Sequence, residues 1–93
     1  MEVYGEAIVA RFARKHPASP RPLQRFLMLA RDATWPHFAA VKNTFAATGF
    51  VAGRLVFDIG GNKYRVVASV DLHAQILVVD RVLTHQEYDR ETI

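Results

Sequence analysis

Cysteine is absent from the 93 residues of this sequence, and that absence excludes several kinds of chemistry. Disulfide bonds, thiolate metal sites and cysteine nucleophiles all need a thiol. A chain without cysteine also suits a reducing compartment, so we expect a cytoplasmic protein. Any catalysis must use other side chains.

Long apolar runs are missing as well. No stretch reaches the ~18 apolar residues that a membrane-spanning helix needs, and the opening MEVYGE has neither the basic nor the apolar part of a secretory signal, so we expect no membrane partner. There is no linker-like Gly/Ser stretch, low-complexity tract or internal repeat. These absences predict one domain over residues 1–93.

The chain does have an ordinary globular composition with a small excess of positive charge. Hydrophobic residues make up 51% and charged residues 23%, which predicts a folded domain. Twelve Lys and Arg against nine Asp and Glu give a formal net charge of +3. This excess is compatible with RNA as a partner and does not demonstrate one. Three of the four histidines (His16, His37 and His73) lack partners at metal-ligand spacing, so we expect no metal or other cofactor.

The first half of the sequence carries helical patterns. A first helix is predicted over residues 3–15, and His16-Pro17 ends it. Its expected apolar side comprises Tyr4, Ala7, Ile8 and Phe12. Ser19 is the predicted N-cap of a second helix whose Pro20 and Pro22 fall in the first turn. Its apolar positions recur at helical spacing at Leu23, Phe26, Leu27 and Ala30. A short helical segment after Trp35-Pro36 is expected to bury Phe38, Val41 and Phe45.

The second half carries strand patterns. Apolar residues alternate over residues 54–59, and Gly60-Gly61-Asn62 then predicts a hairpin loop. The next strand is expected over residues 63–70, with Lys63 and Arg65 on one face. The run at 76–79 is apolar on both faces, which predicts a central strand covered on both sides and interrupted by Asp80 and Arg81.

A capping-box pattern ends the chain. Thr84 and Glu87 stand three residues apart, the spacing that opens a helix with reciprocal hydrogen bonds. With helices first and strands later, the predicted fold class is α+β. We expect a small, mainly antiparallel sheet of three or four strands, N-terminal helices on one face and a short C-terminal helix.

Two motifs carry a family resemblance: residues 61–65, GNKYR, and residues 84–89, THQEYD, separated by the apolar strand at 76–79. In order and spacing the chain resembles HigB-type toxins of the RelE superfamily over nearly its whole length. The resemblance implies a RelE-like fold and the toxin of a type II toxin–antitoxin system, a metal-independent endoribonuclease that cleaves mRNA, usually on the ribosome. It also implies a cognate helix-turn-helix antitoxin, through which alone the toxin would meet DNA.

The sequence departs from the family pattern at two positions. Asp58 stands where Asn is common, and Asp80 stands where an Arg is often found, with Arg81 displaced by one residue. A displacement of one residue along a strand reverses the face. We therefore assign Arg81 to RNA binding and give it no catalytic role.

RNA cleavage by attack of a ribose 2′-hydroxyl needs a proton acceptor, a proton donor and positive charge around the phosphate. With the resemblance, His85 is the candidate for proton transfer, because a free imidazole titrates at about pH 6.5. Lys63 and Arg65 are the candidates for positive charge. Tyr88 shares a helical face with His85 and is the candidate for positioning or a second acid–base role. The predicted RNA-binding residues are Asn62, Arg54, Arg81 and Arg90.

Structural interpretations of the same residues stay open. Lys63 and Arg65 can form a solvated outer face, His85 can be a surface residue, and Tyr88 can anchor the C-terminal segment by packing. Asn62 can serve the turn alone, and Arg54 and Arg90 can pair with nearby carboxylates, namely Asp58, Asp89 and Glu91. The alternative function is a catalytically degenerate toxin, or a small RNA-binding module, that retains antitoxin binding.

Overall fold

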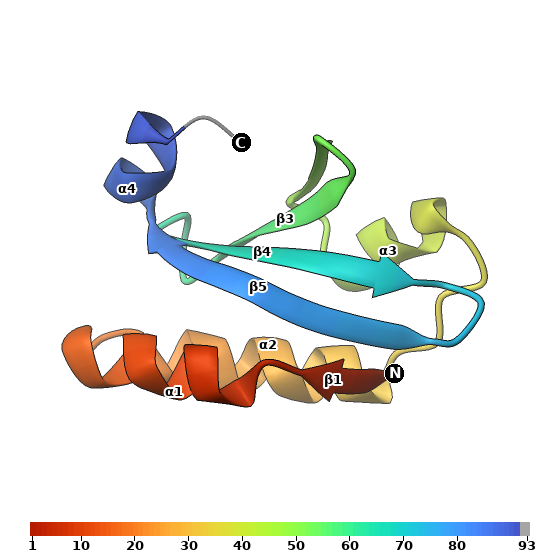
Figure 1. Cartoon of the computed structure of the whole chain (residues 1–93), viewed down its shortest axis with the longest axis horizontal. Coiled ribbons are helices and arrows are strands. Elements are labelled where there is room, and N and C mark those ends of the chain that lie inside the picture. The colour runs from red at the N-terminus through yellow and green to blue at the C-terminus, as the bar shows by residue number, and fades with distance from the viewer. Residues whose placement is uncertain (92–93) are drawn as a thin grey trace.

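The computed structural model describes residues 1–91, which form a mixed sheet with helices beneath it and at its ends (Figure 1). In chain order the elements are β1 (Glu2–Tyr4), α1 (Glu6–Lys15), α2 (Pro20–Asp32), α3 (Phe38–Thr44), β2 (Thr48–Val51), β3 (Arg54–Ile59), β4 (Tyr64–Asp71), β5 (Ile76–Thr84) and α4 (His85–Arg90). The helices α1 and α2 lie beneath the sheet, and α3 and α4 lie at its opposite ends. The predicted α+β class is confirmed.

The sheet has five strands in the order β1-β5-β4-β3-β2. The strand pairs from β5 to β2 are antiparallel, whereas β1 runs parallel to β5. The expectation of three or four strands was therefore wrong. The two strands that it missed are the edge strands, three and four residues long, which are too short to show a repeat of period two.

Gly5 explains why the first helix starts later than predicted. Its φ of 97° lies in the left-handed region, and a Cβ at this position would come within 2.6 Å of the Val79 carbonyl oxygen. Glycine therefore lets the chain turn from β1 into α1 against β5. The predicted start at Val3 was wrong, and so were two assignments to the apolar side. Tyr4 is 52% exposed and Ala7 is exposed as well, whereas Val9 is buried.

The main core lies between the helices and one face of the sheet. All four apolar positions predicted for the second helix are buried there, and α2 begins with the two prolines in its first turn. Ser19 precedes the helix without capping it, because its hydroxyl donates to the His16 carbonyl at 2.7 Å. In α3, Val41 is fully buried but Phe38 is 47% exposed, so the expectation that Phe38 packs beneath the other helices was wrong.

A smaller apolar cluster covers part of the other face of the sheet. It consists of Val56, Val67 and Leu83, with Tyr88 of α4 packed against them. The predicted alternation of β3 is confirmed, since Leu55, Phe57 and Ile59 belong to the main core. The predicted hairpin loop is confirmed too. Its residues Gly60, Gly61 and Asn62 have φ values of 64°, 64° and 73°.

A β-bulge in β5 changes which face Asp80 and Arg81 occupy. Val67 pairs with Arg81, but the next residue, Ala68, pairs with Val79, so Asp80 is the extra residue. Arg81 lies opposite Val67 of the smaller cluster, and Asp80 accepts a hydrogen bond from Ser69 on that same face. Both side chains therefore share one face.

Two expectations about β5 were wrong. β5 continues through Asp80 and Arg81 to Thr84 instead of being interrupted by them. It lies inside the sheet, between β1 and β4, but Val78 is 38% exposed. The strand is therefore not covered on both sides.

Candidate active site

The candidate site forms where the β3–β4 hairpin meets the junction of β5 and α4. The capping box predicted at this junction is present. The Thr84 hydroxyl accepts from the Glu87 amide at 3.1 Å, and the Glu87 carboxylate accepts from the Thr84 amide at 2.9 Å. His85 is the first residue of α4, and its amide donates to the Lys63 carbonyl at 2.9 Å. These bonds fix the histidine backbone against the hairpin.

Arg65 is buried beside that junction, with its side chain only 8% exposed. Its Nε lies 2.9 Å from Oδ1 of Asp58, and its Nη1 donates to the carbonyls of Asn62 and Tyr64, each at 3.2 Å. A buried guanidinium is tolerated when a carboxylate and hydrogen bonds satisfy it, as they do here. Arg65 is therefore not part of a solvated outer face.

His85 lies between Arg65 and a carboxylate of its own helix. Its Nδ1 is 2.5 Å from Nη2 of Arg65, and its Nε2 is 3.0 Å from Oδ2 of Asp89, one helical turn later. The histidine side chain is 45% exposed and that of Asp89 is 60% exposed. The imidazole thus has one edge against a buried cation and the other toward solvent.

Tyr88 combines the packing role with a place at the site. Its ring packs on the smaller apolar cluster and lies 5.8 Å from the guanidinium carbon of Arg65. An open hollow of about 380 Å³ lies beside it, and Asp58, Arg65 and Tyr88 are among the residues that line it. The hollow brings the arginine and the tyrosine to one accessible surface.

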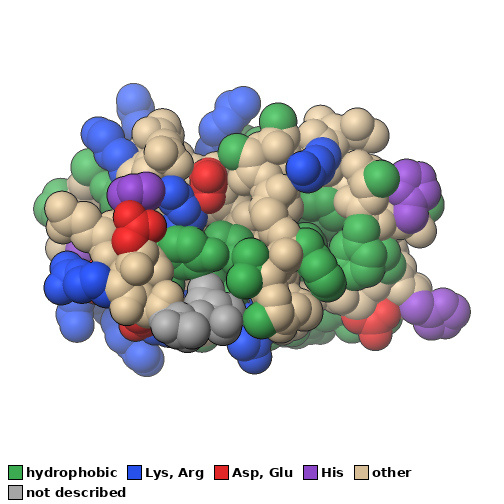
Figure 2. Space-filling view, turned by 90° about the horizontal axis from the view of Figure 1, so that it is seen from above, with side chains coloured by type: hydrophobic (Ala, Val, Ile, Leu, Met, Phe, Trp, Pro, Cys, Tyr) green, Lys and Arg blue, Asp and Glu red, His purple; other side chains and the backbone are tan. Residues whose placement is uncertain are grey.

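Two arginines that were predicted to bind RNA, Arg54 and Arg81, also have carboxylate partners. Nε of Arg54 lies 3.1 Å from Oδ2 of Asp80, and Arg81 forms an ion pair with Glu91. Figure 2 shows acidic and basic side chains interspersed around α4, at the left of the view, with apolar side chains beside them. The surface is therefore mixed in charge and not uniformly basic.

Three predicted residues are exposed, in the hairpin loop and at the end of α4. Lys63 is exposed in the hairpin loop, so its predicted place in a strand beside Arg65 was wrong. Asn62 has the left-handed conformation of a turn residue, and its carbonyl serves Arg65. Arg90 is the exposed last residue of α4.

Sequence reasoning missed two carboxylates as partners within the site, although each had a signal. Asp58 pairs with Arg65 in the register of the hairpin, which follows once the loop is placed at residues 60–63. Asp89 stands four residues after His85, the spacing at which helical side chains meet.

Glu87 supports the site from the capping box. Its hydrogen bond with the Thr84 amide holds the pKa of the Glu87 carboxyl below its ordinary value, with smaller contributions from the Thr84 hydroxyl and from the charges of His16 and Arg90, while burial opposes the shift. The charged form therefore maintains the start of α4 at neutral pH.

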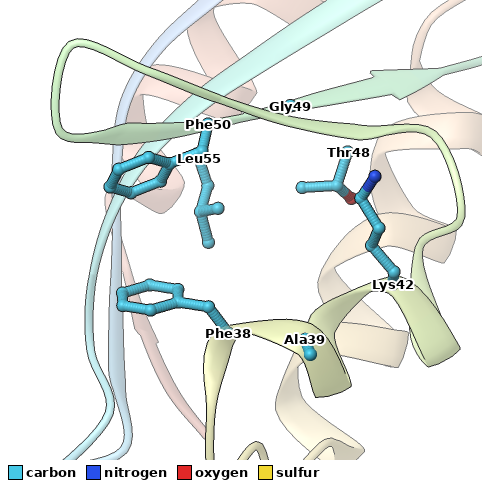
Figure 3. A pocket seen from close by; sticks show the side chains of 7 residues that line it. All are labelled: Phe38, Ala39, Lys42, Thr48, Gly49, Phe50 and Leu55. Carbon is cyan, nitrogen blue, oxygen red and sulfur yellow. The ribbon is translucent and has the colours of Figure 1, made fainter.

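A second hollow, of about 540 Å³, lies between α3 and the β2–β3 hairpin (Figure 3). The rings of Phe38 and Phe50 line it with centroids 5.5 Å apart, and Lys42 is its one titratable side chain. Because Phe50 and Leu55 pair across the hairpin and Leu55 belongs to the main core, this hollow opens on the face of the sheet away from Arg65. With one titratable side chain, it holds no acid–base pair.

Among residues 1–91, no group of three or more His, Asp or Glu side chains is placed to hold a metal ion. No helix in this part of the chain is both long and apolar enough to cross a membrane.

Comparison with known proteins agrees with the sequence motifs. Residues 19–91 match the family of HigB toxins, described as the RelE-like toxic component of a toxin–antitoxin system. The chain is also similar to the mRNA interferase toxin HigB of Escherichia coli K12 and to the mRNA interferases HigB of Escherichia coli O157:H7 and Shigella flexneri. Each is 50% identical over 34 residues, which is 37% of this chain and 33% of each relative. The chain thus matches about a third of the length of these relatives. Since the family match covers most of the sequence, the chain belongs to the HigB family of RelE-like toxins.

Proposed function

We propose that this protein is the toxin of a type II toxin–antitoxin system and an mRNA interferase, a metal-independent endoribonuclease that acts on messages bound to the ribosome. Family membership supports the toxin assignment. The observation that supports the enzymatic part is the contact of His85 with Arg65, which lines the same hollow as Tyr88.

The proposed reaction is a transesterification. The 2′-oxygen of a ribose bonds to the adjacent phosphorus, the bond from phosphorus to the 5′-oxygen breaks, and the products are a 2′,3′-cyclic phosphate and a 5′-hydroxyl. One group takes the proton of the 2′-hydroxyl and another gives a proton to the 5′-oxygen. His85, Tyr88 and Lys63 are the candidates for these transfers, and Lys63 and Arg65 are the candidates for stabilising the phosphate charge.

The charge distribution supports dependence on the ribosome. Arg54, Arg65 and Arg81 each have a carboxylate partner. RNA phosphates must compete with these carboxylates, so the site attracts RNA less than its count of arginines suggests. A message that the ribosome already holds does not depend on that attraction.

A cognate helix-turn-helix antitoxin is the proposed partner, and it is the component that contacts DNA. We place its contact either over the candidate site or on the first two helices. The exposed Arg11, Arg14 and Lys15 of α1 offer a basic face to acidic antitoxin segments there. The proposed compartment is the cytoplasm, where messages are translated.

Induction in bacteria tests the proposal. Expression of the chain alone is expected to arrest growth and to produce cleavage within translated messages, which primer extension detects. Co-expression of an adjacent frame that encodes a helix-turn-helix protein is expected to restore growth.

The degenerate-toxin alternative has its own signature. Asp58 commits Arg65 to an internal ion pair, which is the observation in its favour. It predicts a soluble protein that binds the antitoxin and leaves growth and messages intact. Unimpaired growth with abundant soluble chain would therefore refute the endoribonuclease.

A further inference from the structure

Most N–H groups of the Arg65 guanidinium already have partners within the protein. A guanidinium carries five N–H groups. One contacts Asp58, two contact backbone carbonyls, and one contacts His85. A single N–H of Nη2 thus has no partner among residues 1–91. A side chain so buried and so fully engaged is suited to holding its neighbours in place.

Among the groups that Arg65 contacts, His85 is the one that can take part in the reaction. A guanidinium only donates hydrogen bonds, so Nδ1 of His85, 2.5 Å away, must accept and therefore carries no hydrogen. In a neutral imidazole the hydrogen then lies on Nε2. The opposite edge of the ring agrees, because Nε2 faces the Asp89 carboxylate, which accepts.

The two contacts differ in how firmly they constrain the ring. Asp89 is 60% exposed, and water competes with a contact of that kind. Arg65 is 8% exposed, and Asp58 and two carbonyls anchor it. A hydrogen on Nδ1 would point at an N–H group of Arg65, and the contacts of Arg65 with Asp58 and two carbonyls keep that group in place. Arg65 therefore decides the tautomer.

We propose that Arg65, anchored by Asp58, is a positioning residue that keeps His85 in the tautomer with hydrogen on Nε2. His85 then offers a hydrogen-bond donor to the RNA phosphate, and of the three candidates for proton transfer Tyr88 and Lys63 take the two transfers. This inference rests on the proposed function for the identity of the substrate. Arg65 then acts through the imidazole, in the way that a buried group orients the histidine of a hydrolase triad. The positive charge of Arg65 also stabilises the phosphate, but across the imidazole ring and not by direct contact.

Nuclear magnetic resonance tests the tautomer without any cleavage assay. Protein labelled with ¹⁵N in histidine is studied by long-range ¹H–¹⁵N correlation at a pH about two units above the ordinary imidazole pKa of about 6.5. We expect a protonated Nε2 and an unprotonated Nδ1 for His85. His37 is the internal reference, because its Nδ1 accepts from the Ala40 amide at 3.2 Å and sets the same tautomer.

Two variants separate Arg65 from Asp89 as the cause. Asp89→Ala removes the exposed acceptor and is expected to leave His85 wholly in the Nε2–H form. Adding Arg65→Met to Asp89→Ala is expected to give a mixture of both tautomers. Asp80→Asn is the matched control, because it removes a carboxylate that pairs with a different arginine on the same face. We expect it to leave the His85 signals unchanged.

Cleavage rates of Asp58 variants test whether the positioning role of Arg65 matters for the reaction. Asp58→Ala is expected to lower the single-turnover rate on ribosome-bound message by about 10- to 100-fold, the cost of losing an outer group that orients a metal-ligating imidazole, with little change in the half-saturating concentration. Asp58→Asn keeps an oxygen that accepts from Nε of Arg65, so it is expected to recover part of the rate.

The inference and the proposed function fail separately. Nδ1–H or mixed tautomers in the parental protein or in Asp89→Ala would overturn the positioning role, even if RNA is cleaved. A parental rate in folded Asp58→Ala would overturn it as well. Absence of cleavage by the parental protein would instead count against the proposed function and leave the spectra unaffected.

Discussion

Replacing Arg65 by alanine is expected to destabilise the fold, because the guanidinium satisfies a carboxylate, two carbonyls and a ring nitrogen. Breaking a buried ion pair by removing one partner costs about 3–5 kcal/mol. The Asp58 side chain is 35% exposed, so water replaces part of what it loses. We therefore expect the free energy of unfolding to fall by about 1–3 kcal/mol, the cost of leaving buried polar groups unsatisfied.

Urea denaturation of paired variants measures this loss. Arg54→Ala is the matched control, since Arg54 also pairs with a carboxylate on this face but is 50% exposed. Such exposed pairs contribute about 0–1 kcal/mol. For a domain of this size each kcal/mol corresponds to about 4–8 °C in Tm. If Arg65→Ala unfolds at the same urea concentration as Arg54→Ala, the account of Arg65 as a buried anchor is refuted.

Further predictions concern the fold and the antitoxin. Gly5→Ala is expected to cost more than about 1 kcal/mol, because φ is 97° and the new Cβ meets the Val79 carbonyl; an unchanged Tm would contradict this. Thr84→Ala is expected to cost about 0.5–2 kcal/mol through loss of the helix cap, as thermal unfolding measures. Because the folded-state pKa of Glu87 is lowered, its stabilisation is present above the unfolded-state pKa and is lost as the pH falls through the folded-state value. Glu87→Gln should therefore differ from the parent at neutral pH and converge with it in acid. Antitoxin binding through the basic surface should weaken with added salt in titration calorimetry, and a salt-insensitive complex would indicate an apolar groove instead.

Local signals predicted the parts of the fold that depend on neighbouring residues. The helical spacing of α2, the glycine-rich hairpin and the capping box each lie within a few residues, and all three are present. The edge strands could not be predicted in this way. β1 is defined by its pairing with β5, where Glu2 lies opposite Ile76, so its strand character comes from a distant segment.

The candidate site was predictable in three of its members, but neither in its two carboxylates nor in its arrangement. The motifs named Arg65, His85 and Tyr88, and the structure brings these three together. Alternation showed which face Arg65 occupies, but burial on that face depends on α4 and on the register with Asp58. The bulge at Asp80 is likewise a property of two paired strands, which the sequence of one strand does not reveal.

The central claim is that the chain cleaves messages at a site built on His85. The direct measurement is cleavage of a defined message in the ribosomal A site by the purified protein, by His85→Ala and by His73→Ala as the matched exposed histidine elsewhere. We predict cleavage by the parent and by His73→Ala. For His85→Ala we predict a rate lower by about 10²- to 10³-fold, the usual cost of deleting one preorganised donor. Cleavage by folded His85→Ala at the parental rate would contradict the claim.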